Sequence, residues 1–230
     1  MLPLKDTVRA STRPIVMPIL LVVNVLVFVL IELPLSEPDL NKLLIIFGVV
    51  PARLVAPPIG PDAYTLVTSQ FLHGGWLHLA SNMLALWIFA DNVEDRMGHL
   101  RFLLFYLICG VLAGLTHVWA DPTSTVPALG ASGALAGVLA AYMLMFPKAR
   151  VLTLVPVFIL PWVVEIPAVL WLGGWFVSQL FQGFTALTDE AAGNAGGVGY
   201  WAHVGGFVAG ALLNWVFRRS QPQPAPGTAA

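Results

Sequence analysis

The chain has few charged residues. Only 10% of its 230 residues are charged, whereas 58% are hydrophobic, and the mean hydropathy is +0.83. Soluble globular domains carry about 25% charged residues, so this composition excludes an ordinary soluble domain. The chain is predicted to lie in a lipid bilayer.

Basic charge and cysteine are also scarce. The net charge is −1 and the isoelectric point is near 6.5, so there is no basic field to attract nucleic acid, which is excluded as a partner. The one cysteine, Cys109, lies in an apolar segment. It cannot form an intrachain disulfide and does not indicate the redox compartment.

Long apolar stretches are abundant. A helix needs about 20 apolar residues to cross a bilayer. Six stretches approach this length, at 15–33, 77–94, 101–119, 132–147, 164–184 and 203–217. The first is longer than the apolar core of a signal peptide, and no small-residue cleavage site follows it, so we interpret it as a retained anchor. The stretch 151–163 contains Pro156 and Pro161 and is interpreted as an interfacial connection. The fold class predicted is an all-α bundle of six transmembrane helices.

The basic residues predict the orientation. Nine of the eleven fall on one side of a six-helix arrangement: Lys5, Arg9, Arg13, Arg96, Arg101, Lys148, Arg150, Arg218 and Arg219. Because Lys and Arg are retained on the cytoplasmic side, both termini are predicted to be cytoplasmic. The expected organisation is an N-terminal segment at 1–14, a membrane domain at 15–217 and a polar, Pro-rich, disordered tail at 218–230.

This topology brings four polar residues to one depth. The second, fourth and sixth helices all run from outside to inside, and they begin near His78 and Asn82, Ser132, and His203, respectively. His78 and Asn82 are four residues apart and therefore share a helix face. Polar groups facing lipid are costly, so these side chains are expected to face the bundle interior or a water-filled cavity.

These residue types favour nucleophilic catalysis. A serine hydroxyl is a weak nucleophile until a neighbouring base takes its proton, and Ser132 with His203 would form such a dyad. The candidate carboxylates for a triad, Asp121, Asp189 and Glu190, lie in predicted loops, so a full triad is not expected.

The same region offers donors for a developing oxyanion. Asn82, His78 and the backbone N–H of Ser132, at a helix start, could supply them. Gly130 and Gly133 flank the serine and would let a substrate backbone approach closely.

Three motifs carry a family resemblance: "GASG" around Ser132, "HLASN" from His78 to Asn82, and "AHVGGFVAG" from Ala202 to Gly210. With "FLHGGWLHLASNM" and "VEDRMGHLRF", the chain resembles bacterial members of the rhomboid intramembrane serine proteases from about residue 15 to 217. The resemblance implies Ser132 as nucleophile, His203 as general base and acid, and His78 and Asn82 as oxyanion-stabilising groups. It also implies transmembrane protein substrates, no metal or organic cofactor, and a location in a bacterial inner membrane.

Two features depart from that family pattern. The family often has an aromatic residue four positions after the nucleophile, packed against the histidine, whereas this chain has Ala136. Tyr200 or Trp201 is predicted to support His203 instead. The Trp-Arg pair of some members' first loop is also absent, which bears on the packing of that loop more than on the chemistry.

Alternatives remain open for this pattern. A serine between glycines commonly packs helices together, and Gly133 with Gly137 would do so; Gly206 and Gly210 are predicted to pack, plausibly against the fourth helix. An inactive relative that binds transmembrane clients is a second function class. A small transporter is a third, although the chain lacks the internal repeat typical of that class.

The remaining polar residues have mostly structural interpretations. Glu94 and Arg96 are predicted to fix a loop, and His99 and His117 are not assigned to catalysis. His73 lies close to the proposed site and is a minor candidate for substrate contact.

Overall fold

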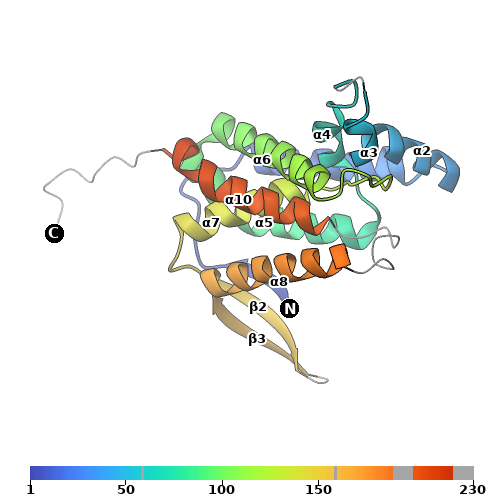
Figure 1. Ribbon diagram of the computed structural model, residues 1–230. Coiled ribbons are helices and arrows are strands. Elements are labelled where there is room, and N and C mark those ends of the chain that lie inside the picture. The colour runs from blue at the N-terminus through green and yellow to red at the C-terminus, as the bar shows by residue number, and fades with distance from the viewer. Residues whose placement is uncertain (58–59, 158–159, 189–198, 220–230) are drawn as a thin grey trace, which may run out of the picture.

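The computed structural model describes residues 1–57, 60–157, 160–188 and 199–219. Most of this chain is helical, and the longest helices lie side by side as a bundle (Figure 1). The helices of the bundle are α1 (Val16–Val27) with its π-helical continuation η1 (Phe28–Glu32), α5 (Trp76–Met97), α6 (His99–Ala120), α7 (Ser132–Met145), α8 (Ala168–Thr188) and α10 (Tyr200–Phe217).

Short helices occupy the long connection between η1 and α5. They are α2 (Glu37–Phe47), α3 (Pro51–Leu54), α4 (Thr65–Thr68) and the 3-10 turn η2 (Ser69–Phe71). They gather at one end of the bundle (Figure 1). The backbone N–H of Gly130 donates to the Ser69 carbonyl at 2.9 Å, so this connection holds the residues that precede α7.

Each of the six expected apolar stretches overlaps a helix of the bundle over most of its length. Among the described residues, α6 is the one helix that by itself has both the length and the apolarity to cross a bilayer; α1 with η1, and α7, are apolar but shorter. The helical fold is therefore confirmed in outline, while the number of membrane spans and the orientation of the termini stay predictions.

The all-α expectation is wrong in one region. A three-stranded antiparallel sheet joins β1 (Leu2–Asp6), β2 (Arg150–Val157) and β3 (Leu160–Pro167) in the order β1-β2-β3. Hence 151–163 belongs mainly to a hairpin, and α8 begins at Ala168 rather than 164. The reason is the β-branched content of these strands, which favours a pleated conformation. Pro156 and Pro161 face each other across the hairpin, so both prolines lie inside the paired strands.

α7 lies at the centre of the bundle. All ten residues from Gly133 to Tyr142 are buried. α7 packs closely on α10, because a Cβ added at Gly206 would collide with the carbonyl of Gly133, and one at Gly210 with the backbone of Gly137. This confirms the predicted packing role of Gly206 and Gly210, since small residues let helix backbones approach.

The outer faces of the bundle helices are apolar. On α10, Leu212, Trp215 and Val216 are each more than 60% exposed, and α6 exposes Trp119 in the same way. Contiguous apolar surface of this kind is unusual on a soluble monomer and suits contact with lipid chains.

Glu94 fixes the start of α1. Its buried carboxylate accepts the backbone N–H groups of Ile15, Val16 and Met17 at 2.8–2.9 Å and also contacts the ring of His99. The first N–H groups of a helix have no intrahelical partner, and a carboxylate there also complements the helix dipole. Glu94 thus has a structural role, although it holds the start of a helix rather than the predicted loop.

Candidate active site

Ser132 and His203 meet where α7 and α10 begin. Nε2 of His203 lies 2.7 Å from Oγ of Ser132, although 71 residues separate them in sequence. His203 is buried at 7% exposure, whereas Ser132 is partly exposed. The close approach of α7 and α10 at Gly133 and Gly206 accounts for this contact, because it brings the two helix starts together.

The backbone before Ser132 depends on glycine. Gly130 has φ +119°, a conformation that L side chains rarely adopt. A Cβ at this position would lie 2.7 Å from Nε2 of His78, so the imidazole rests directly against the Gly130 backbone. The missing side chain of Gly130 thus makes room for the imidazole of His78, while the close approach of a substrate backbone stays a prediction.

His78 lies on α5 and faces the Ser132 region. Its Nδ1 accepts the backbone N–H of Gly74 at 3.3 Å, which leaves Nε2 as the N–H nitrogen of the neutral ring. Nε2 and Cε1 are the ring atoms that lie beside Gly130, so this N–H is on the side of the ring next to the residues that precede the serine. His73 packs its ring against His78 with centroids 5.1 Å apart, and both of its ring nitrogens are buried without partners among the described residues.

Asn82 lies one turn after His78 on α5. It is 5% exposed, and its Nδ2 has no hydrogen-bond partner in the part of the chain that the structure describes. Buried polar groups are normally hydrogen-bonded, so such an orphaned donor requires an explanation. A donor kept free for a developing negative charge is one explanation that the chemistry of this site supplies.

Two residues of α8 contact His203 and were missed from the sequence. Oε1 of Gln179 lies 2.7 Å from Nδ1 of His203, and the ring centroid of Trp175 lies 5.6 Å from that of the histidine. A signal was present, since Gln179 is a polar residue inside an apolar helical stretch and polar groups at such positions mark functional sites. It was not recognised because nothing in the sequence indicates which helix faces His203.

The other predicted supporting residues are Trp201, Tyr200 and Gly133, and Ala136 is the departure from the family pattern. Trp201 donates from Nε1 to the Gly183 carbonyl at 3.2 Å and packs on Phe184, so its described contacts run to the end of α8. Tyr200 begins α10 and is partly buried. Ala136 is fully buried in α7, and Gly133 packs close to Ala113.

The carboxylates considered for a triad do not complete one among the described residues. The Asp121 carboxylate accepts the backbone N–H and the hydroxyl of Thr123 at the end of α6. Asp189 and Glu190 lie outside the described residues. Within the described ranges, no three His, Cys, Asp or Glu side chains are grouped so as to hold a metal ion.

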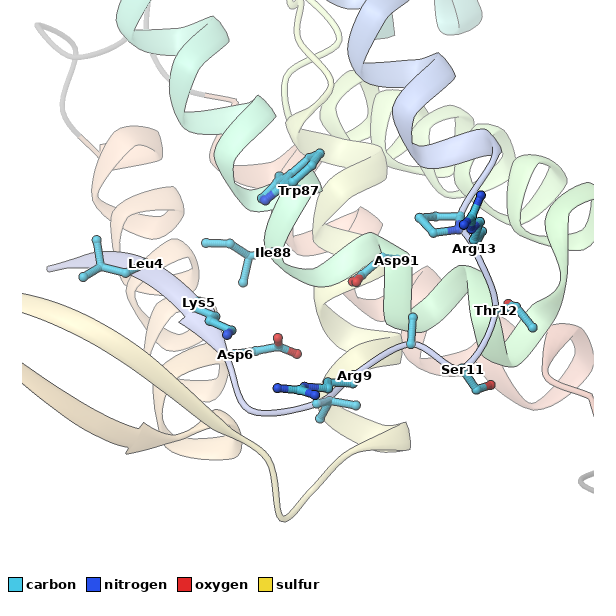
Figure 2. A pocket seen from close by; sticks show the side chains of 13 residues that line it. Leu4, Lys5, Asp6, Arg9, Ser11, Thr12, Arg13, Trp87, Ile88 and Asp91 are labelled. Carbon is cyan, nitrogen blue, oxygen red and sulfur yellow. The ribbon is translucent and has the colours of Figure 1, made fainter.

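A cavity of about 590 Å³ lies elsewhere in the molecule. It is lined by the N-terminal segment from Leu4 to Pro14 and by three residues of α5, and Figure 2 shows Asp6, Arg9 and Asp91 in it. Asp91 follows His78 by thirteen residues on α5, which is about 20 Å along a helix axis. None of the candidate site residues lines this cavity.

Comparison with known proteins places these features in one family. The Rhomboid domain family matches residues 61–220, which include Ser132, His203, His78 and Asn82. The chain is 31% identical over 209 residues to "Rhomboid protein 1, mitochondrial" of Saccharomyces cerevisiae, a match that covers 87% of this chain and 53% of the yeast protein.

Relatives occur in other compartments and organisms. "Rhomboid protease GluP" of Bacillus subtilis is 29% identical over 201 residues, covering 87% of this chain and 35% of that protein. "Rhomboid-like protein 11, chloroplastic" of Arabidopsis thaliana is 30% identical over 164 residues, covering 69% and 54%. The chain thus spans about half the length of these relatives, or less. It belongs to the rhomboid family, whose members are integral membrane proteins and, in general, intramembrane serine proteases.

Proposed function

We propose that this chain is an intramembrane serine endopeptidase in which Ser132 and His203 form the catalytic dyad. The observation that carries the proposal is the 2.7 Å contact between Oγ of Ser132 and Nε2 of His203. This is the distance at which an imidazole can take the proton of a hydroxyl.

The proposed reaction proceeds through an acyl-enzyme. Oγ of Ser132 attacks the scissile carbonyl carbon while Nε2 of His203 takes the hydroxyl proton, and the carbonyl oxygen becomes an oxyanion. Nε2–H then protonates the leaving amine as the C–N bond breaks. A water molecule, deprotonated by His203, releases the new carboxyl end and restores the serine.

Three donors are proposed for the oxyanion: Nδ2 of Asn82, the ring N–H of His78 and the backbone N–H of Ser132. Support comes from the unpartnered state of Asn82 Nδ2 and from the position of His78 against Gly130. The N–H of Ser132 belongs to the first turn of α7, where backbone N–H groups have no intrahelical partner and the helix dipole favours negative charge.

The proposed substrates are membrane proteins cleaved within or beside a transmembrane segment. A helix in lipid cannot arrive through solvent, so it must enter laterally between helices, while water reaches Ser132 from the outer face. Because a helix satisfies its peptide groups internally, scission requires local unwinding. Helix-breaking residues near the cut should therefore promote cleavage; unchanged cleavage after replacing such Gly or Pro residues with Leu would contradict this step.

The membrane topology is part of the proposal. Six spans with both termini in the cytoplasm account for the apolar stretches and for nine of the eleven basic residues. We propose the bacterial inner membrane as the location, which agrees with the bacterial relative. Protease accessibility of tags at each terminus in inverted and right-side-out vesicles tests the orientation.

A fluorophosphonate probe tests the dyad directly, because it traps a serine only when the hydroxyl is activated. Purified wild-type protein in detergent is expected to be labelled, and Ser132→Ala and His203→Ala are expected to abolish labelling. Ser124→Ala is the matched control, since Ser124 lies in the connection before α7 and its hydroxyl contacts the Val126 backbone rather than a histidine.

The outcomes separate the function classes. Folded wild-type protein that is not labelled, or labelling that persists in both variants, would overturn the dyad and favour a relative that binds transmembrane clients without cleaving them. Substrate-driven flux in liposomes containing the protein would instead favour a transporter.

A further inference from the structure

We propose that Gln179 is a positioning residue that holds His203 in the one tautomer able to act as a base toward Ser132. The inference rests on the proposed dyad and adds a residue from a third helix to it. Gln179 is 6% exposed and lies on α8, whereas Ser132 and His203 begin α7 and α10 (Figure 1).

The directions of four linked hydrogen bonds carry the argument. The Ser178 hydroxyl donates to the Trp175 carbonyl at 2.6 Å, so its single proton is used. Nε2 of Gln179 lies 3.1 Å from the same Ser178 oxygen, which can therefore only accept. The side-chain amide of Gln179 must therefore direct its N–H to Ser178 and its Oε1 to His203.

The orientation of Gln179 then decides the protonation of His203. Oε1 of Gln179 lies 2.7 Å from Nδ1 of His203 and can only accept, so Nδ1 carries the proton. In a neutral imidazole with Nδ1–H, Nε2 has the free lone pair. Nε2 lies 2.7 Å from the Ser132 hydroxyl oxygen, so this series of hydrogen bonds leaves its lone pair free to receive the serine proton.

Trp175 adds a second contact from the same helix. It precedes Gln179 by four residues, so both side chains lie on one face of α8. Its ring lies at 5.6 Å and 36° to the imidazole. α8 thus supplies both an aromatic ring that packs on the imidazole and an acceptor for its Nδ1–H. The residue four positions after Ser132, where the family often has an aromatic ring, is Ala136 in this chain.

The test compares two substitutions with opposite expectations. Gln179→Glu keeps an acceptor oxygen at the same reach, as the carboxylate does in a serine protease triad. Gln179→Met keeps the length and unbranched shape but removes the acceptor. A positioning role predicts that cleavage of a transmembrane substrate falls in the order wild type, Glu, Met. A packing role predicts that Met resembles wild type and Glu is worst, because it buries a carboxylate.

A positioning role for Gln179 predicts a change in kcat without a comparable change in KM. Gln179→Met should lower kcat on the order of 10- to 100-fold, by analogy with the loss found when the hydrogen-bond partner of a metal-bound histidine is removed. KM should stay within about twofold, because Gln179 acts on the base and not on ground-state substrate binding. Gln182→Met is the matched control, because Gln182 lies on the same helix and donates to the Ser178 carbonyl, and no hydrogen bond joins it to His203 among the described residues. It should behave as wild type.

A second measurement does not depend on activity or on the folding of the Gln179 variants. The ¹⁵N spectrum of histidine-labelled wild-type protein, with His203 assigned by comparison with His203→Ala, reports which ring nitrogen carries the proton. Protonation at Nδ1 supports the proposal, and protonation at Nε2 overturns it. Wild-type protein that is labelled and cleaves, with Gln179→Met equally active, would overturn the role of Gln179 alone. Unlabelled wild-type protein would overturn the proposed function, while the spectrum still decides the tautomer.

Discussion

Polar side chains at the two ends of α7 and on the adjacent helix α5 differ in their hydrogen bonding. Near the end of α7, the Tyr142 hydroxyl donates to Asp6 at 2.5 Å, and Nδ2 of Asn92 donates to the same carboxylate at 3.0 Å. At the start of α7, Ser132 is partly exposed, and Nδ2 of Asn82, which lies on α5, has no partner among the described residues.

Two asparagines on the same helix, α5, show this difference in hydrogen bonding. Asn92 and Asn82 both lie on α5 and both are buried. Among the described residues, Nδ2 of Asn92 donates twice, to Asp6 and to Asp91, whereas Nδ2 of Asn82 donates to none. Oδ1 of Asn92 is unpartnered, but an acceptor cannot stabilise an anion. A used donor secures the fold, while a free donor is available to a reacting oxygen.

Both networks join parts of the chain that are far apart. Asp6 belongs to β1 and contacts α5 and α7, so it ties the N-terminal segment to the bundle, and Figure 2 shows it beside the cavity between that segment and α5. The Ser132 end joins α7 to α10 and, through Gln179, to α8. The first network holds the N-terminal segment against the bundle, and the second joins the residues proposed to react.

The largest expected effect is a loss of activity without a loss of stability when Asn82 is replaced. Asn82→Ala should lower kcat about 10²- to 10³-fold, the cost of removing one oxyanion donor, and should hardly change the unfolding temperature because Nδ2 has no partner to lose. Cleavage kinetics and thermal unfolding in detergent measure both quantities. A large loss of stability with unchanged kcat would contradict the proposed role.

The matched substitution of Asn92, near the end of α7, should lower stability and leave activity unchanged. Asn92→Ala removes a donor from the buried Asp6 carboxylate and should cost about 1–3 kcal/mol of stability. The activity of the protein that remains folded should equal that of wild type, because Asn92 lies far along α5 from His78. Reduced kcat in fully folded Asn92→Ala protein would show that the two ends are coupled.

The smallest expected effect is a pH dependence of stability at Asp6. Burial raises the pKa of its carboxyl above the ordinary value near 4, although the hydroxyl of Tyr142 opposes this. The folded state therefore binds this proton more tightly than the unfolded state, and the contribution of Asp6 to stability falls as pH rises above about 4. Asp6→Asn does not titrate, so its stability relative to wild type should improve from acid to neutral pH. Unfolding midpoints at several pH values measure the trend, and an opposite slope would contradict it.

Much of the helical fold was predictable, because a long apolar stretch in lipid must satisfy its own backbone and can do so as a helix. Each predicted stretch overlaps a helix over most of its length. The sheet was not predicted, because 151–163 was interpreted only through its two prolines. The β-branched residues of β2 and β3 carried the missing signal, and their pairing with Leu2–Asp6 requires contact between distant segments.

The sequence by itself determined which side chains are available for chemistry: a serine between glycines, two histidines and an asparagine at helix starts, in an otherwise apolar chain. The tertiary structure decided which of them meet. The contact between Ser132 and His203 depends on the close approach of α7 and α10 at their glycines, and the contact of Gln179 with His203 depends on the rotation of α8. Helical periodicity defines the faces of each helix, but only packing against neighbours decides which face turns toward the site.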